Sequence, residues 1–463
     1  MTFLNRLRPW FCTAVVIVGL LEFFYEKIPL LVFGGGCIVL FAFVFLFPLL
    51  SFYTRVIVVV LGSSSLLSIF LSKTAVPFEE IIGGFTEMAP LVALLAAVSL
   101  LGIPLELGRY AELFQRFYAG VRNPAQPYVI SLLISYILTL LALAGAIVPS
   151  YYLIQDNLRK LGLEQDSRME TTIIVRSYAL AIIVSPVAAT VGITVKYSGL
   201  SWVQMVGPVF LLSLAGLAAS IVLEMSRAGS RGGSAQNQNF RAVRPSAVSL
   251  HRLAGFLVLF LGVVGATLIL GSVCHIPSLS SIALGCLLAT FIWGLISARR
   301  PLLLERSFSF FSRDIIKTAD QTALFITAGF FTYALEAGGV LKIIGNFMEV
   351  AAGKMDIAVI LIAVPPVIMF LAVIGLHPFA SGIIIAKALQ AAPLEFNALG
   401  LAVALMGGMS LSFVISPYSV LVLILSSLTG KSPYRLGIRW NSAFAAVFWG
   451  MIAVFILFVA RMP

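Results

Sequence analysis

Charged residues are scarce in this sequence of 463 residues, because Asp, Glu, Lys and Arg together make up only 11% of it. Hydrophobic residues make up 60%, and the mean hydropathy is +1.07. The apolar residues form long runs rather than short alternating segments, which argues against an outer-membrane β-barrel. This composition predicts an all-α polytopic membrane protein.

The sequence also lacks the motifs of known catalytic sites. It contains no GxSxG, no P-loop, no HExxH and no cofactor fingerprint. Its three histidines lie far apart in the chain, and its four cysteines show no metal-binding spacing, so free thiols are expected. The cysteines are Cys12, Cys37, Cys274 and Cys286. These absences indicate a protein that is not an enzyme and has no metal site or cofactor, apart from a coupling ion such as Na⁺ or H⁺.

The net charge of +11 would suit a nucleic-acid-binding protein, but the positions of the charges argue against that class. Most of the 30 basic residues fall in loops that a consistent topology places on one side of the membrane. This is the positive-inside pattern of a bacterial inner-membrane protein. It predicts a cytoplasmic N-terminus and, with an odd number of spans, a periplasmic C-terminus.

We predict about eleven transmembrane spans and two re-entrant hairpins. The spans cover about residues 9–25, 28–50, 54–72, 88–107, 171–199, 203–224, 252–272, 278–298, 319–336, 398–430 and 438–460. The hairpins cover about residues 124–158 and 356–392. A polar, Gly/Ser-rich cytoplasmic linker at 226–250 separates the first half, 28–225, from the second half, 251–463, and the first span, in 1–27, lies outside both halves.

The two halves form an internal repeat with an offset near 230 residues. The landmarks in register are Leu105-Glu106-Leu107-Gly108 with Leu335-Glu336-Ala337-Gly338, Pro149 with Pro378, Ser185-Pro186 with Ser416-Pro417, and Gly199 with Gly430. Counting charges places the two hairpins on opposite faces of the membrane. We therefore predict an inverted repeat, which is typical of secondary transporters.

Two spans contain a Ser-Pro pair near their centre. Proline removes a backbone donor and clashes with the carbonyl four residues earlier, so each pair predicts a break near mid-membrane. Broken helices at corresponding places in two halves indicate a substrate site. The alternative is a pair of proline kinks with packed hydroxyl groups.

The candidate binding residues lie at these breaks and at the hairpin tips, where helix N-termini expose unpaired N–H groups. They are Pro149, Ser150, Ser185, Pro186, Thr190, His377, Pro378, Ser381, Ser416, Pro417 and Ser419. Hydroxyl groups and helix N-termini suit a small anion, and Na⁺ could bind at the same breaks.

Three charged or titratable residues in or near the membrane segments have two interpretations each. His377 could carry a proton or could be a satisfied polar group. Arg176 and Lys387 could be charge partners in a site or could extend to the membrane surface. Glu336 and its repeat equivalent Glu106 are interpreted as capping or packing residues.

This arrangement resembles the ion transporter superfamily, which includes the divalent anion–sodium symporters, the C4-dicarboxylate carriers and the TRAP large permease. The residues that carry the resemblance are Ala334-Leu335-Glu336-Ala337-Gly338-Gly339, the two hairpin tips and the two Ser-Pro breaks. The resemblance implies a scaffold domain, a transport domain with both hairpins, elevator-type alternating access and a homodimer. Sodium-coupled anion members carry Ser-Asn-Thr at the tips, whereas this chain has Val148-Pro149-Ser150 and His377-Pro378-Phe379, so coupling to H⁺ through His377 is the alternative to Na⁺.

The expected function is secondary active transport of a small, carboxylate-like organic anion across the inner membrane. The expected partners are the lipid bilayer, the anionic substrate and a second copy of the chain, with no nucleic acid. Two alternatives stay open: a flippase or exporter of a lipid-linked or amphipathic substrate, and a membrane subunit of a larger transport complex.

Overall fold

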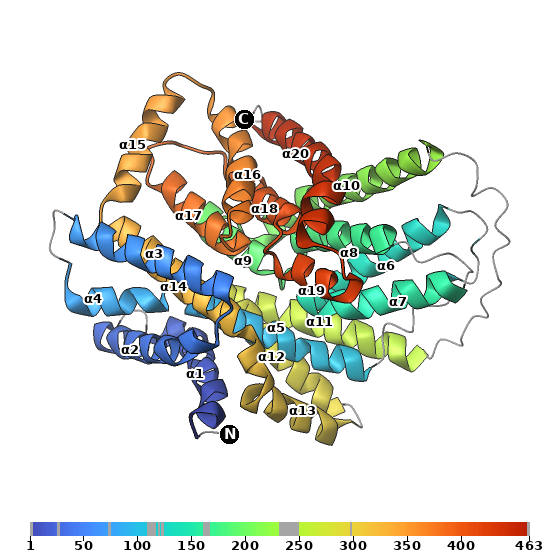
Figure 1. The fold of residues 1–463 in the computed structure, drawn as a ribbon, viewed down its shortest axis with the longest axis horizontal. Coiled ribbons are helices and arrows are strands. Elements are labelled where there is room, and N and C mark those ends of the chain that lie inside the picture. Colours follow the sequence, from blue (N-terminus) through green and yellow to red (C-terminus); the bar gives the residue numbers. More distant parts are fainter. Residues whose placement is uncertain are drawn as a thin grey trace. The chain divides into compact units, whose positions relative to one another are not determined.

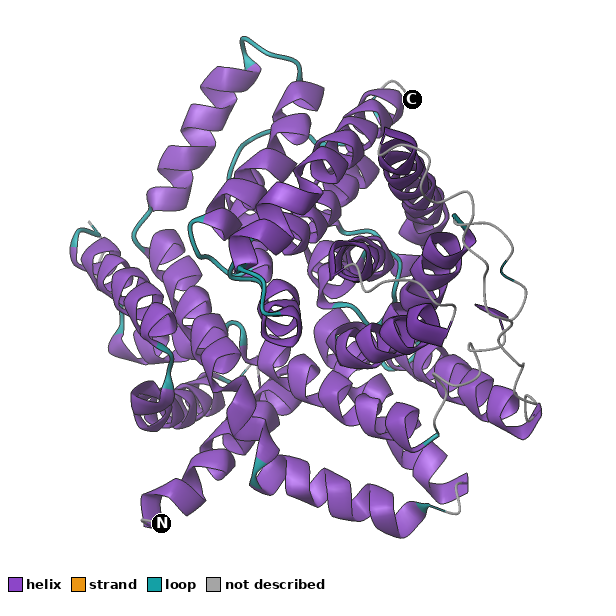
Figure 2. Ribbon diagram, turned by 45° about the vertical axis from the view of Figure 1, so that its right-hand side comes forward, coloured by secondary structure: helices purple, strands orange, loops and turns teal. Residues whose placement is uncertain are grey.

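The computed structural model describes residues 3–25, 28–72, 76–108, 117–118, 121, 125–160, 167–230, 250–296 and 299–460. Throughout these ranges the secondary structure is helical, and Figure 2 shows helices and loops without a strand. Eight of the helical segments are long and apolar enough to cross a membrane, and one pair of helices bent by 69° would make a ninth. The predicted all-α polytopic membrane class is therefore confirmed.

The helices follow the order shown in Figure 1. α1 (Phe3–Tyr25) precedes the first half, whose helices are α2 (Pro29–Leu46), α3 (Phe52–Phe70), α4 (Phe78–Gly83), α5 (Ala89–Leu107), α6 (Gln126–Ala142), α7 (Ile147–Lys160), α8 (Ser167–Ile182), α9 (Ala189–Ser198) and α10 (Trp202–Ser230). Those of the second half are α11 (Leu250–Ser272), α12 (Ser278–Ile296), α13 (Arg300–Ser312), α14 (Ala319–Ala337), α15 (Val340–Ala352), α16 (Ile357–Val373), α17 (Pro378–Gln390), α18 (Ala398–Ile415), α19 (Val420–Thr429) and α20 (Trp440–Val459). Short 3₁₀ turns and one π turn, Arg435–Arg439, join some of them.

The helix bounds agree with the predicted interruptions. The hairpin predicted at 124–158 corresponds to α6 and α7, and the one predicted at 356–392 to α16 and α17. The broken spans predicted at 171–199 and 398–430 correspond to α8 with α9 and to α18 with α19. Most of the predicted linker 226–250, namely residues 231–249, lies outside the described residues, as do residues 1–2 and 26–27 of the first segment.

Three pairs of equivalent helices in the two halves have equal lengths. α5 and α14 each contain 19 residues, α6 and α16 each contain 17, and α9 and α19 each contain 10. Equal helix lengths at equivalent positions are expected of an internal repeat. The inverted orientation of one half relative to the other stays a prediction.

The second segments of the two breaks begin after an extended residue and end at a left-handed glycine. The residue before Pro417, Ser416, is extended with φ −67° and ψ 122°, because a following proline disfavours the helical conformation. The second segments, α9 and α19, both end at a glycine in the left-handed conformation, Gly199 with φ 73° and Gly430 with φ 65°. Glycine is the usual residue at such a helix end, because its missing Cβ removes the steric cost of positive φ.

The hairpin tips also turn through positive φ. Leu143 follows α6 with φ 44°, and Gly375 lies between α16 and α17 with φ 116°. A side chain at positive φ costs on the order of 1 kcal/mol, so the first tip has a strained residue where the second has a glycine.

The chain divides into two compact units. Unit 1 contains Met1–Ile103, Gly262–Ile357 and Phe379–Glu395, and unit 2 contains Pro104–Leu261, Ala358–Pro378 and Phe396–Pro463. Crossings between units fall well inside two helices, at Pro104 in α5 and at Gly262 in α11, and one residue after the start of α16 and of α17. The first hairpin lies in unit 2, whereas the return arm of the second hairpin, α17, belongs to unit 1.

Candidate functional site

The two broken helices cross inside unit 2. The second segment of the first break, α9, packs against α18, and the second segment of the other break, α19, packs against α8 and α7. Near the crossing the Ser410 hydroxyl donates to the Ala179 carbonyl at 2.7 Å, and the rings of Tyr178 and Phe413 meet edge to face with centroids 5.5 Å apart. The predicted breaks are therefore brought together in one structural unit.

The serines of the two Ser-Pro pairs attach the breaks to the hairpins. Ser185 donates its hydroxyl proton to the carbonyl of Leu140 at 2.6 Å, and Ser416 donates to the carbonyl of Ala372 at 2.7 Å. Leu140 lies near the end of α6 and Ala372 near the end of α16, so the two bonds are equivalent in the repeat. Both serines are buried. Their hydroxyl groups thus donate hydrogen bonds to backbone carbonyls of the hairpin arms.

Ser419 uses its hydroxyl within its own break. It donates to the Phe413 carbonyl at 3.2 Å and accepts from the backbone N–H of Val422 at 3.4 Å, as an N-cap of α19. Pro186 and Pro417 end the first segments of the two breaks and supply no donor.

Two other candidate hydroxyls have no hydrogen-bond partner among the described residues. Thr190 is the second residue of α9 and 0% exposed, and Ser150 is the fourth residue of α7 and 1% exposed. A buried hydroxyl left unpaired costs about 1–3 kcal/mol. Both lie in the first turn of a helix, where backbone N–H groups lack helical acceptors and the dipole favours negative charge. These positions can donate to an acceptor that enters the break.

The second hairpin tip approaches the same crossing through His377. Its ring packs edge to face on Phe413 with centroids 5.9 Å apart, and Phe413 in turn packs on Tyr178. Pro378 begins α17, a position that suits proline because the first helical N–H has no acceptor. Of the remaining candidates, Pro149 is exposed in the first turn of α7, and Ser381 is buried in α17, within unit 1.

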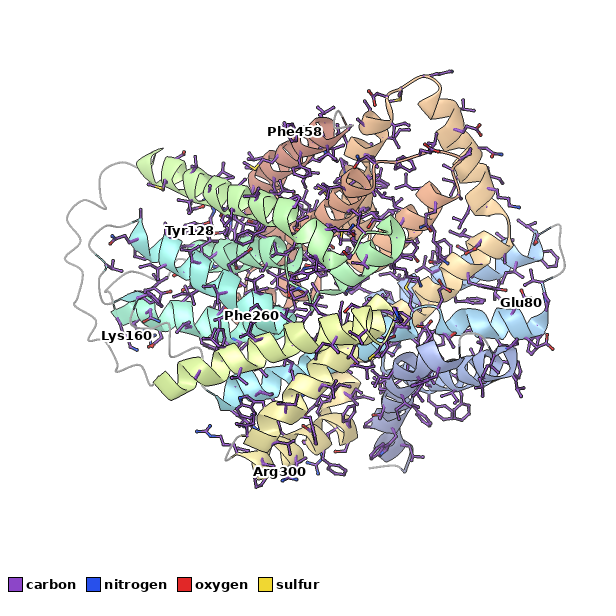
Figure 3. The ribbon with its side chains drawn as sticks, turned by 180° about the vertical axis from the view of Figure 1, so that it is seen from behind. Glu80, Tyr128, Lys160, Phe260, Arg300 and Phe458 are labelled. Carbon is purple, nitrogen blue, oxygen red and sulfur yellow. The ribbon has the colours of Figure 1, made fainter. Side chains whose placement is uncertain are left out.

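Arg176 is fully buried in unit 2 and does not extend to the surface, which was one of the two interpretations of the sequence. Its Nε donates to Asn441 Oδ1 at 3.0 Å, and its Nη1 donates to the hydroxyl of Tyr128 at 3.1 Å. Tyr128 is labelled on α6 in Figure 3. The carboxylate of Glu224 lies 3.5 Å from Nη1, and the guanidinium lies 5.4 Å from the Phe444 ring centroid.

These contacts join α8 to three other helices: α6, α10 and α20. Asn441 also donates its Nδ2 to the carbonyl of Leu436 at 2.8 Å, inside the π turn that precedes α20. The arginine therefore holds the helix bundle of unit 2 together. The sequence contained a signal for these polar partners. Asn441 and Glu224 lie in or beside apolar spans, where placing a polar side chain costs free energy.

Lys387 forms a charge cluster in unit 1. Its Nζ lies 2.9 Å from a carboxylate oxygen of Glu87 and 3.0 Å from one of Glu336. Glu336, interpreted from the sequence as a capping or packing residue, pairs its carboxylate with this ammonium. Sequence reasoning missed Glu87, although an acid inside the apolar segment Phe78–Pro104 was a signal.

Among the residues that the structure describes, no three His, Cys, Asp or Glu side chains come together as a metal site. All four cysteines are free, two of them buried and two exposed.

Comparison with known proteins gives matches in structure only. No protein-family model matches the chain, and no curated protein sequence matches it. The fold is similar to that of the YdaH transporter of Alcanivorax borkumensis, reported to have an unusual topology, with a TM-score of 0.60 and 16% identity over 93% of this chain and 98% of that one. It is also similar to MtrF of Neisseria gonorrhoeae, described as illuminating a class of antimetabolite efflux pumps, with a TM-score of 0.58 and 13% identity over 89% of this chain and 95% of that one. At these identities the likeness concerns the fold.

Proposed function

We propose that this protein is a secondary active transporter that moves a small organic anion across a bacterial inner membrane. The observation that carries the proposal is the buried, unpaired hydroxyl of Thr190 at the start of α9, where two broken helices cross. The transporter folds similar to this chain support the same class, as does its multi-pass helical structure.

An anion fits this site better than a cation. The first turns of α7, α9 and α19 offer backbone N–H groups and the positive ends of helix dipoles, and Thr190 and Ser150 add hydroxyl donors. Ser185, Ser416 and Ser419 donate their protons to backbone carbonyls, so they shape the breaks and leave recognition to the unpaired groups. A carboxylate is the simplest acceptor for such donors.

The remaining features of the proposal come from the resemblance to the ion transporter superfamily. They are coupling to Na⁺ or H⁺, elevator-type alternating access and a homodimer. The proposal also places the N-terminus in the cytoplasm and the C-terminus in the periplasm. The positive-inside bias of the sequence supports the orientation.

Thr190→Val tests the site without changing side-chain size. Because the native hydroxyl has no partner, the variant should keep the melting temperature of the ligand-free protein or raise it slightly. The purified protein and the variant are screened by differential scanning fluorimetry against carboxylates, sulfonates and oxyanions, with and without Na⁺. An anion that raises the melting temperature of the native protein should lose most of this effect in the variant.

Thr194→Val is the matched control. Thr194 lies one turn further along α9, equally buried, but its hydroxyl donates to the Thr190 carbonyl at 2.8 Å. This variant should keep the ligand-induced shift. If Thr190→Val kept the shift as well, the site would lie elsewhere.

Export of an amphipathic substrate is the second candidate. The fold similarity to MtrF, described with antimetabolite efflux pumps, favours testing it. Proteoliposomes loaded with an anion found in the screen distinguish the two directions. An exporter that exchanges the anion for the coupling ion releases the anion only when the gradient of that ion is directed into the liposome.

A further inference from the structure

The last turn of α8, before the first break, ends in backbone carbonyls that the helix itself does not satisfy. Two of them receive hydrogen bonds from other helices of unit 2. The Ser410 hydroxyl of α18 donates to the Ala179 carbonyl at 2.7 Å. The Ser213 hydroxyl of α10 donates to the Leu180 carbonyl at 2.9 Å. These acceptors at the end of α8 therefore already have donors from the protein.

Trp202, the first residue of α10, supplies a donor to the break itself. Its indole Nε1 donates to the carbonyl of Val184 at 3.1 Å. Val184 is buried and lies two residues after the end of α8 and five residues before the start of α9. The indole therefore attaches the segment that connects α8 to α9, residues 183–188, to α10.

The helix that carries Trp202 is fixed on both sides of this residue. Before it, Ser201 donates its backbone N–H and its hydroxyl to Oε1 of Gln204, at 2.8 Å and 2.9 Å, so that Gln204 reaches back over the start of α10 as in a capping box. After it, Ser213 bonds α10 to α8, and Tyr136 of α6 shares a hydrogen bond with the same hydroxyl at 2.9 Å. Trp202 therefore belongs to a helix end that is held independently of the break.

The helix that follows the break, α9, begins without a side-chain cap. Its N-cap residue is Ala188, which is extended with ψ 135° and makes no capping hydrogen bond through its side chain. The first N–H groups of a helix need acceptors from outside it. Thr190, 0% exposed, adds a hydroxyl that has no hydrogen-bond partner among the described residues. The start of α9 thus offers hydrogen-bond donors, whereas acceptors at the end of α8 are already occupied.

The second break is closed by one of its own side chains. Ser419 is the N-cap residue of α19, and its hydroxyl accepts from the backbone N–H of Val422 at 3.4 Å. The same hydroxyl donates to the carbonyl of Phe413, near the end of α18, at 3.2 Å. A single serine therefore serves both ends of this break. The first break has an alanine, Ala188, as the N-cap residue.

The carbonyl equivalent to that of Val184 also has a different neighbour. Ile415 follows Val184 by 231 positions, the separation of the two Ser-Pro pairs. Its carbonyl packs closely on the backbone of Gly437, where an added Cβ would lie 2.7 Å from the oxygen. Backbone packing thus constrains this carbonyl, as the indole of Trp202 constrains its equivalent. The two breaks are therefore held in different ways, and the indole belongs to the one that carries the unpaired hydroxyl.

We propose that Trp202 is a positioning residue for the anionic group of the substrate, which binds at the start of α9 rather than at the start of α19. The indole holds the Val184 carbonyl, and through it the segment 183–188, in the course that places the first turn of α9. A carboxylate oxygen accepts from the Thr190 hydroxyl and from N–H groups of this turn, and so takes the acceptor role that Ser419 has in the second break. The inference rests on the proposed transport function, and it names the break that takes the anionic group.

Trp202→Phe tests this role because it removes the indole donor and keeps an aromatic ring. Trp449→Phe is the matched control, since Nε1 of Trp449 also donates to a backbone carbonyl of unit 2, that of Ile362, at the same distance of 3.1 Å. Both variants lose one indole hydrogen bond, so the melting temperature of the ligand-free protein should fall to a similar extent in each. A merely structural role of Trp202 would produce this effect and no other.

Affinity for the anion separates the two variants. Isothermal titration calorimetry of the detergent-solubilised protein uses the N-methyl-D-glucamine salts of acetate, succinate and benzoate as probes. For the probe that the native protein binds most tightly, Trp202→Phe should raise the dissociation constant at least about fivefold, and Trp449→Phe should leave it within about twofold of the native value. Equal dissociation constants in the two variants would overturn the positioning role.

Hydrogen exchange of the ligand-free protein gives a second measurement, which uses no anion. Exchange of residues 183–192 should become at least about twofold faster in Trp202→Phe than in the native protein, whereas residues 414–423 should be unchanged. Unchanged exchange at 183–192 would overturn the positioning role. In the native protein, the bound probe should slow exchange at 188–192 and not at 419–423, and the reverse pattern would place the anion at the wrong break.

Thr190→Val distinguishes a failure of this inference from a failure of the proposed function. If this variant loses binding while Trp202→Phe and Trp449→Phe bind the probe equally well, the anion site stands and the positioning role is wrong. If Thr190→Val binds as the native protein does, or if the native protein binds none of the three probes, the anion site is wrong and the positioning role with it.

Discussion

Ser410 of α18 donates its hydroxyl to the carbonyl of Ala179 of α8, and the two residues are 231 positions apart, the offset of the repeat. Each lies six residues before the serine of its own Ser-Pro break. The two broken helices therefore touch at equivalent positions. Their contact fixes the crossing on which the proposed substrate site depends.

Ser410→Ala should weaken this crossing. The variant removes a buried hydrogen bond between two helices, so we expect the free energy of unfolding to fall by about 1 kcal/mol. Thermal unfolding of the detergent-solubilised protein measures the change. Ser412→Ala is the control, since Ser412 is equally buried but donates to Gly408 of its own helix, and it should lower the melting temperature less.

Ser185→Ala and Ser416→Ala should loosen the hairpins. Each variant removes the bond from a break to the first arm of a hairpin, to Leu140 in one half and to Ala372 in the other. We expect each to destabilise by about 1 kcal/mol and to speed hydrogen exchange at the end of α6 or α16 respectively. Faster exchange in the wrong hairpin, or in neither, would show that these bonds do not hold the arms.

Arg176→Met should destabilise unit 2 strongly. It removes the charge partner of Glu224 and leaves the hydrogen-bonding groups of Asn441 and Tyr128 without their donor. Breaking a buried pair from one side costs about 3–5 kcal/mol. Arg227 lies 3.8 Å from Glu224 and still pairs with it in the variant, so we expect a loss at the lower end of this range. Chemical denaturation measures it. Adding Glu224→Gln should recover part of the lost stability. A further loss would show that the Glu224 carboxylate is stabilised by groups other than Arg176.

Gly199→Ala and Gly430→Ala should each cost about 1 kcal/mol, because both glycines have positive φ. No atom lies within 4 Å of a Cβ added at either position, so the cost comes from the backbone alone. Asparagine tolerates this conformation better than alanine, so Gly→Asn at the same positions should restore part of the melting temperature. Equal effects of Ala and Asn would indicate steric crowding instead.

Much of the fold followed from the sequence because prolines, glycines and apolar runs act locally. Pro186 and Pro417 located the breaks within a few residues, and Gly199 and Gly430 located the ends of α9 and α19. The repeat predicted equivalent hairpins, and the first arms of the two hairpins, α6 and α16, each contain 17 residues.

The partners of the polar side chains could not be predicted in the same way. Whether the Ser185 hydroxyl meets a ligand or the Leu140 carbonyl depends on how two helices pack, and no local pattern encodes this contact. Glu87 and Lys387 are 300 residues apart in the chain, and only the packing of α17 in unit 1 brings them together. The sequence therefore predicted candidate residues at the breaks, and the structure shows that the hydroxyls of Thr190 and Ser150 among them have no hydrogen-bond partner in the described part of the chain.

Pro104 is the first residue of unit 2 after the chain leaves unit 1 within α5, and its ring nitrogen carries no hydrogen. The carbonyl of Leu100, four residues earlier, therefore receives no helical hydrogen bond from residue 104. One backbone hydrogen bond is therefore absent at this point of α5, which makes the helix easier to bend where the chain passes from one unit to the other.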